Sequence, residues 1–216
     1  VARRKLRHRL EYGAVRGLGA LLAALPRRVA LVVACGVAAV GYALAARRRR
    51  EAARRVRLVF GESLGPWEVA RVCWVSFRNT AFNAVEMIRI AKLSLPEMEA
   101  MMPELPGAVA TLREIMARNG GRGVVVALPH MGNWDLAGSA CHLSGLPIFS
   151  VAGRQRNPMM NDLLNRLRSG RGMDILERGG GALRQILTRL RGGQIFAILP
   201  DTRAPDPDLL VPFLGG

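Results

Sequence analysis

Cysteine and aromatic residues are scarce in this chain of 216 residues. The three cysteines, Cys35, Cys73 and Cys141, lie far apart, and only Cys141 has a neighbouring metal-type ligand, His142. Such spacing is not that of a disulfide framework or of a zinc site. Aromatic residues make up 5% of the chain, too few for the stacking platforms that bind single-stranded nucleic acids. These shortages argue against a disulfide scaffold, a zinc protein and a nucleic-acid-binding protein.

Acidic residues are also few, because 16 Asp and Glu stand against 32 Lys and Arg, for a formal net charge of +16. That balance indicates an anionic partner, and nucleic acid, anionic lipid and an acidic carrier protein all have the required charge. No basic recognition motif accompanies the charge, so a membrane-anchored nucleic-acid binder remains the weaker interpretation. Half of the residues are hydrophobic, which favours a folded chain with a real core.

An uncharged run of 18 residues, "VALVVACGVAAVGYALAA", covers positions 29–46 between Arg27–Arg28 and Arg47–Arg50. As a helix it would be about 27 Å long, slightly less than the roughly 30 Å hydrocarbon core of a bilayer. It can span the membrane, lie embedded at its surface, or be a buried helix of a soluble core. Four arginines follow it in place of a small-residue cleavage site, which argues against a signal peptide. With the apolar stretch 13–26, it predicts a hydrophobic helical hairpin in a membrane-associated region, residues 1–50.

The remainder, residues 51–216, alternates between helical and strand patterns. We expect a long helix that begins at Pro66 and strands that are separated by helices of about ten residues. Apolar strands alternating with helices predict an α/β fold, with a mixed, mostly parallel sheet flanked by helices on both faces. The expected strands are 123–128, 147–152, 173–177 and 194–200, and the expected helices are 66–92, 106–119, one beginning near 133, 158–169 and 181–191.

The stretch "VVVALPHMGNWDLAG", residues 124–138, places a histidine at the end of a buried strand. Ligands bind at such strand ends in α/β sheets. Gly132 permits a tight turn after His130, and Asn133 is a suitable N-cap for the next helix. With His130 in the turn and Asp135 in the first helical turn, the carboxylate can reach back to the ring. We therefore predict that Asp135 fixes the tautomer of His130 and leaves the other ring nitrogen as a base.

A His–Asp pair without a serine or cysteine nucleophile makes a general base for a hydroxyl that arrives on the substrate. The helix N-terminus beside it would offer backbone amides to an oxyanion. An alternative interpretation stays open at this point, in which the histidine is satisfied by a local carboxylate and merely caps a helix. The sequence contains no constellation of metal ligands, and we expect neither a metal nor another cofactor.

These residues resemble a known family. "HMGNWD" is similar to the His-x4-Asp box of the lysophospholipid acyltransferase superfamily. Its surroundings resemble the lipid A late acyltransferases, which include phosphatidylinositol mannoside acyltransferases. The likeness covers nearly the whole chain, through "GLGALLAALPRR", "YALAARRRREAARRVRLVFGE", "FRNTAFNAVEMIRI", "GRQRNPMMNDLLNRLRSGRGMDILER" and "LPDTRAPDPDLLVPFLGG".

The resemblance implies an O-acyltransferase with His130 as base on the acceptor hydroxyl and Asp135 as its partner. The family's arginine after the Asn-Pro pair matches Arg168, or Arg166 if the alignment slips by two, and its strand-end aspartate matches Asp201. Basic and amide side chains are expected to bind substrate phosphates, although a solvated basic helix face is the alternative for most of the arginines. The expected substrate-binding set is Asn133, Arg154, Asn157, Arg166, Arg168 and Asp201.

The implied reaction moves a fatty acyl group from a thioester, acyl carrier protein or coenzyme A, to a hydroxyl of an anionic glycolipid. A lipid A precursor is the expected acceptor and phosphatidylinositol mannoside the alternative, at the cytoplasmic face of the bacterial inner membrane. Two departures from the family stand out. Asp201-Thr202-Arg203 replaces the usual Asp-Gln-Asp, and the chain stops at Gly216 where members continue. We therefore expect a chain truncated at its C-terminus, with an inactive membrane scaffold as the non-enzyme alternative.

Overall fold

The computed structural model describes residues 2–170 and 172–201, which form two compact units. One unit joins the chain up to Leu21 with Glu86–Asp201, and the other comprises Leu22–Val85. The grouping reflects packing, and the membrane-associated region 1–50 and the acyltransferase domain 51–216 stay predictions. The helices are α1 (Ala2–Ala24), α2 (Arg27–Leu44), α3 (Ala46–Phe60), α4 (Pro66–Arg89), the short 3-10 helix η1 (Ile90–Lys92), α5 (Leu95–Met101), α6 (Leu105–Arg118), α7 (Trp134–Leu143), α8 (Pro158–Ser169) and α9 (Ala182–Arg191); the strands are β1 (Val125–Ala127), β2 (Ile148–Ala152), β3 (Asp174–Glu177) and β4 (Ile195–Ile198).

The unit that contains the sheet is an α/β structure, as the sequence predicts. Its described strands lie in the order β1-β4-β2-β3, and all three pairings are parallel. The strands are shorter than expected, and the sheet is parallel where a mixed sheet was allowed for. Since every strand points the same way, the carboxyl ends of β1, β4 and β2 meet at one edge, and the loops that carry the expected site follow those ends.

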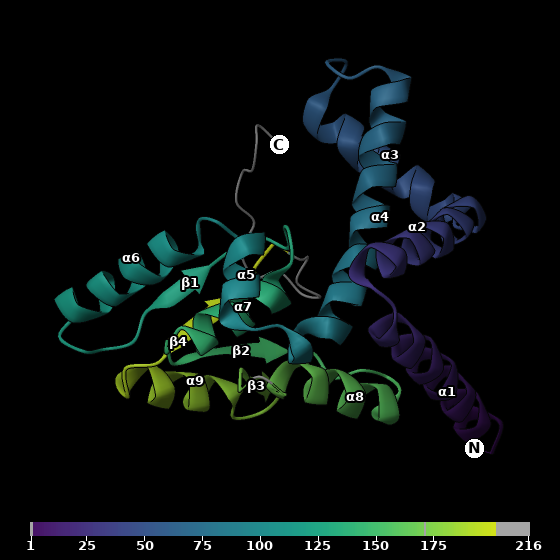
Figure 1. Ribbon diagram of the computed structural model, residues 1–216. Coiled ribbons are helices and arrows are strands. Elements are labelled where there is room, and N and C mark those ends of the chain that lie inside the picture. Colours follow the sequence, from purple (N-terminus) through teal and green to yellow (C-terminus); the bar gives the residue numbers. More distant parts are fainter. Residues whose placement is uncertain (1, 171, 202–216) are drawn as a thin grey trace. The chain divides into compact units, whose positions relative to one another are not determined.

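Successive residues of the central strands face opposite sides of the sheet, as the pleat requires. Ile148 and Ile195 belong to the cluster that packs against α5, α6 and α7. Phe149 and Phe196 belong to the opposite cluster, where their rings stack at 5.2 Å and α9 covers them. Burial of one such side chain stabilises the fold by about 1.5–3 kcal/mol. Figure 1 shows α7 and α9 on opposite sides of the sheet, so both faces of its central strands are covered, whereas the edge strand β1 leaves Val125 and Ala127 exposed.

The second unit is helical, and α2 packs within it through small residues. Ala30, Ala34 and Ala38 are buried at a spacing of four, and the ring of Tyr42 lies edge-on to Trp74 of α4 at 5.5 Å. Other positions of α2 leave large apolar side chains exposed, namely Val32, Val37 and Val40. By length and composition, α2 could cross a membrane: its mean hydropathy is 1.6, and no other helix among the described residues is both long enough and apolar enough.

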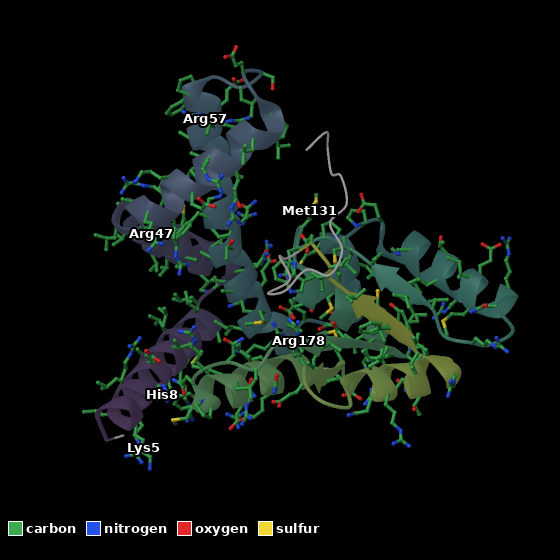
Figure 2. All side chains as sticks on the ribbon, turned by 180° about the vertical axis from the view of Figure 1, so that it is seen from behind. Lys5, His8, Arg47, Arg57, Met131 and Arg178 are labelled. Atoms are coloured by element: carbon green, nitrogen blue, oxygen red, sulfur yellow. The ribbon has the colours of Figure 1, made fainter. Side chains whose placement is uncertain are left out.

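Helix α3 follows α2 almost directly and has a strongly basic surface. None of its described side chains is buried, and Figure 2 shows Arg47 and Arg57 at two levels of it. Arg54 and Arg55 both donate to Glu51 and lower the pKa of its carboxyl to about 2. Even so, arginines outnumber this single acid on α3, so its surface keeps a net positive charge.

Candidate active site

The register of the sheet brings His130 and Asp201 together at its carboxyl edge. Strands β1 and β4 are parallel neighbours, in which Val125 pairs with Phe196 and Ala127 with Ile198, a constant offset of 71 positions. His130 lies three residues beyond the end of β1, and Asp201 lies three residues beyond the end of β4. Their offset is also 71, so the two chains run on in step past the last paired residues and present these side chains to each other.

The Asp201 carboxylate binds His130 with both oxygens. Oδ1 lies 2.6 Å from the ring nitrogen Nδ1, and Oδ2 accepts a hydrogen bond from the backbone N–H of His130 at 2.8 Å. Both hydrogen bonds lower the pKa of the Asp201 carboxyl, and the bond to the His130 ring lowers it more than the bond from the His130 backbone. Because an ionised carboxylate only accepts hydrogen bonds, Nδ1 carries the proton. The other ring nitrogen, Nε2, is then the basic one.

Asp135 has a different partner from the one that the sequence predicts. Its Oδ1 lies 2.9 Å from Nε of Arg168, in the last turn of α8. Asp135 is buried, in the first turn of α7, where the helix dipole favours a negative charge. The prediction that Asp135 holds the tautomer of His130 was wrong, because it considered only neighbours in the sequence, whereas strand pairing supplies a nearer acid from 71 positions away.

Two side chains and one glycine shape the turn around His130. The ring of Trp134 meets the His130 ring edge-on, with centroids 4.8 Å apart. Met131 leaves 74% of its surface exposed beside the base (Figure 2). Gly132 has a φ of +60°, a left-handed conformation that side-chain-bearing residues adopt only at a cost. The predicted turn at Gly132 is therefore confirmed.

Exposed arginines follow the neighbouring strand β2. Arg154 and Arg156 lie in the loop between β2 and α8, and Arg166 lies on α8 itself; all three are exposed. Since β2 lies beside β4, this loop begins at the same sheet edge as Asp201. Their predicted role in phosphate binding stays a prediction, although their position at this edge is compatible with it.

The two asparagines of the expected substrate-binding set both make protein contacts. Asn133 caps α7 by accepting a hydrogen bond from the backbone of Leu136, which confirms the predicted N-cap. Asn157 caps α8 in the same way and has 6% of its surface exposed. The side-chain amide of Asn133 donates a hydrogen bond to Glu86. Nothing in the sequence indicated this role for Glu86 beyond its place on the long helix α4.

The partnership of His130 with Asp201 did have a signal. The first strand ends in "ALPH" at 127–130 and the last in "ILPD" at 198–201, each a Leu-Pro pair followed by a side chain able to do chemistry. Two parallel neighbouring strands with equal tails place those side chains opposite each other. Thr202 and Arg203, the departure from the family pattern, lie outside the described residues.

No group of three or more His, Cys, Asp or Glu side chains that could hold a metal ion occurs among the residues that the structure describes. The arrangement at the sheet edge consists of an imidazole oriented by a carboxylate, with exposed arginines in the loop after the strand next to β4. It is suited to taking a proton from a substrate hydroxyl.

A family model for bacterial lipid A biosynthesis acyltransferases matches residues 2–216. A comparison with curated protein sequences gives no significant match. Because the family model covers essentially the whole chain, the protein belongs to the bacterial lipid A biosynthesis acyltransferases. It is therefore an acyltransferase of lipid A or glycolipid synthesis, from a family that is membrane-associated in bacteria.

Proposed function

We propose that the protein transfers a fatty acyl group from an acyl thioester to a hydroxyl of a lipid A precursor, with His130 as general base. The observation that carries this proposal is the 2.6 Å contact between His130 Nδ1 and Asp201 Oδ1. It holds the ring in place with Nδ1 toward the carboxylate, so Nε2 is the nitrogen that can accept a proton from the substrate. A well-placed base of this kind contributes about 10²- to 10⁴-fold to the rate.

In the proposed reaction, Nε2 of His130 accepts the proton of the acceptor hydroxyl while its oxygen attacks the thioester carbonyl. The carbon–sulfur bond then breaks, the ester forms, and the proton passes from the imidazolium to the departing thiolate. Asp201 stabilises the imidazolium between these steps, as the acid of a catalytic triad does. In this reaction the acceptor hydroxyl is the nucleophile, so no covalent intermediate on the protein is needed.

The tetrahedral intermediate carries a negative oxygen that needs hydrogen-bond donors. Arg168 is a candidate, since the contact with Asp135 uses its Nε and a guanidinium has five N–H groups. Backbone amides beside Gly132, at the start of α7, are a second source. Arg154, Arg156 and Arg166 would bind phosphates of the glycolipid or of the thioester carrier, with their planar forks matching phosphate oxygens.

We further propose that α2 anchors the protein in the cytoplasmic face of the inner membrane. Arginines flank α2 at both ends, and α3 extends the basic surface. Each basic residue near an anionic membrane surface contributes attraction of about 1 kcal/mol. Acyl carrier protein is acidic, so the same net charge of +16 would favour its docking.

The test incubates membranes that carry the protein with labelled acyl carrier protein and a lipid A precursor. Wild type should transfer the label, and His130→Ala should lose at least 10²-fold. Arg118→Ala is the control, because it removes an exposed side chain of α6 that pairs with Glu114, and it should transfer at the wild-type rate. Transfer that survives in His130→Ala contradicts the assignment of the base.

Failure of every variant, with the protein folded and membrane-bound, contradicts a lipid A acceptor. A screen of glycolipid acceptors, phosphatidylinositol mannoside among them, would then separate a different acceptor from an inactive scaffold.

A further inference from the structure

Asn133 and Asn157 stand at the starts of α7 and α8, the helices that carry Asp135 and Arg168. The side-chain oxygen of each asparagine accepts a hydrogen bond from the backbone of its own helix. Oδ1 of Asn133 accepts a hydrogen bond from the backbone N–H of Leu136 at 3.1 Å, in the first turn of α7. Oδ1 of Asn157 accepts one from the backbone N–H of Met159 at 3.1 Å, in the first turn of α8. Each asparagine is therefore an N-cap that satisfies a free amide of its own helix.

The amide nitrogen of each asparagine binds a glutamate from an earlier helix. Nδ2 of Asn133 donates to Oε2 of Glu86 at 3.0 Å, near the C-terminal end of α4. Nδ2 of Asn157 donates to Oε2 of Glu11 at 3.2 Å and to the backbone oxygen of His8 at 3.0 Å, both in α1. Each helix start is thus tied to a carboxylate that the sequence places at least 47 positions away.

The geometry and the charge of the two asparagine–glutamate contacts both favour a fixed arrangement. The asparagine oxygen faces a donor and the nitrogen faces a carboxylate, so neither amide can turn over without losing both bonds. Hydrogen bonds to an ionised group are stronger than neutral ones. At the second contact, bonds from Arg7 and then from Asn157 lower the pKa of Glu11, which keeps it charged. Asn157 is also buried, so water does not compete for its amide.

The orientation of these helices decides the geometry of the site. Asp135 lies two residues beyond Asn133, while Arg168 lies eleven residues beyond Asn157, at the far end of α8. At about 1.5 Å per residue that is a lever of roughly 16 Å, so a tilt of about 5° at the cap would move Arg168 by roughly 1.4 Å. A displacement of that size would break its 2.9 Å contact with Asp135.

We propose that Glu86 and Glu11 are positioning residues for acyl transfer, which fix the starts of α7 and α8 through Asn133 and Asn157. Both asparagines hold helices in this way, and their predicted binding of substrate stays a prediction. The kinetic part of this proposal rests on the proposed function, whereas its structural part does not. Displacements of about 1 Å in a catalytic geometry cost up to 10²-fold in rate.

The test compares Glu86→Ala and Glu11→Ala with Glu86→Gln and Glu11→Gln in the full chain. Glutamine keeps an oxygen that accepts from the asparagine, whereas alanine does not. Glu114→Ala is the matched control, because it removes an exposed glutamate of α6 that pairs with Arg118 and contacts no cap. Backbone amide hydrogen exchange and the steady-state kinetics of acyl transfer are the two measurements.

We expect the alanine variants to raise exchange about tenfold in the first turn of one helix each, α7 for Glu86 and α8 for Glu11. In the acyl-transfer assay they should lower kcat about tenfold, while the glutamine variants and the control stay within about threefold of wild type on both measurements. Exchange at those turns that equals wild type in the alanine variants overturns the proposal. A rise spread evenly over the whole sheet also overturns it, because the glutamates would then support the fold at large.

Failure of the proposed function would show separately, as equal transfer by wild type and His130→Ala. The exchange result would decide the positioning role in that case too.

Discussion

Arg168 and Asp135 join the end of one helix to the start of another, with Nε 2.9 Å from Oδ1. The cation lies in the last turn of α8 and the anion in the first turn of α7, so each stands at the helix end whose dipole it complements. Their side chains are largely enclosed, at 20% and 11% exposure. Such a pair is costly to break from one side, because the remaining charge loses its partner in a poorly solvated place.

Arg168→Ala should therefore destabilise the protein more than the double variant Asp135→Ala with Arg168→Ala. We expect a loss near the lower end of about 3–5 kcal/mol for the single change, since the pair is not fully buried, and a smaller loss when both charges go. Urea unfolding of the four proteins of this double-mutant cycle measures the coupling. Losses that simply add would contradict the inferred ion pair.

Asp201→Asn should abolish most of the acyl transfer while leaving the fold intact. The asparagine amide would donate to Nδ1 of His130, which favours the tautomer with the proton on Nε2, so the base is lost. Replacing the acid of a catalytic triad in this way costs about 10⁴-fold in kcat, and we expect 10²- to 10⁴-fold here.

The control for this change is Asp174→Asn, which alters another carboxylate of the same sheet that pairs with Arg189. Single-turnover transfer by the two variants provides the measurement. Equal rates for Asp201→Asn and wild type would mean that Asp201 does not orient the histidine.

The contact between Asp201 and His130 should also make stability depend on pH in the acid range. Because the pKa of Asp201 is lowered from its ordinary value of 3.8, the folded state binds this proton less tightly than the unfolded state. The contribution is therefore complete above about pH 4 and is lost as the pH falls through the folded pKa. Melting temperatures of wild type and Asp201→Asn, measured from pH 7 to pH 2.5, should converge at the acid end. Curves that stay parallel throughout would contradict this linkage.

A charge in the middle of α2 should weaken membrane attachment. Val37 is 53% exposed near the centre of the apolar helix, and arginine at the centre of a membrane-spanning helix costs about 2.5–3.5 kcal/mol on insertion scales. We expect Val37→Arg to leave the membrane pellet on alkaline carbonate extraction. Val59→Arg, a matched change on the basic helix α3, should remain where wild type does. Full retention of Val37→Arg would argue that α2 does not enter the hydrocarbon region.

Local signals in the sequence predicted the elements around the site well. Pro66 begins α4, Asn133 caps α7, and His130 follows a strand, as expected. Each of these is decided by interactions within a few residues, such as a missing N–H, a capping oxygen or an apolar run. Hence a single sequence, without an alignment, suffices to place them. The strand before His130 was expected to be buried, which was wrong, because β1 lies at the edge of the sheet and Val125 and Ala127 are exposed.

The matching Leu-Pro tails point to Asp201 as the partner of His130 only once the order of the strands is known. Asp135 is five positions away and chemically suitable, but its position on α7 turns it toward Arg168. Asp201 becomes the partner only when β4 inserts between β1 and β2, a strand order that periodicity does not reveal. The glutamates that bind the capping asparagines had no signal in the sequence, because they arrive from α1 and α4 through tertiary packing.

The parallel register of β1 and β4 also decides which changes in chain length this enzyme can accept. Insertions in the loops between the two strands alter the separation of His130 and Asp201 along the chain but leave the sheet register as it is. Deletion of one residue from either Leu-Pro tail shifts one partner by a whole residue and turns it to the other side of the sheet. The loops between β1 and β4 can therefore differ in length among homologues and engineered versions. The two four-residue segments 127–130 and 198–201 tolerate no change in length.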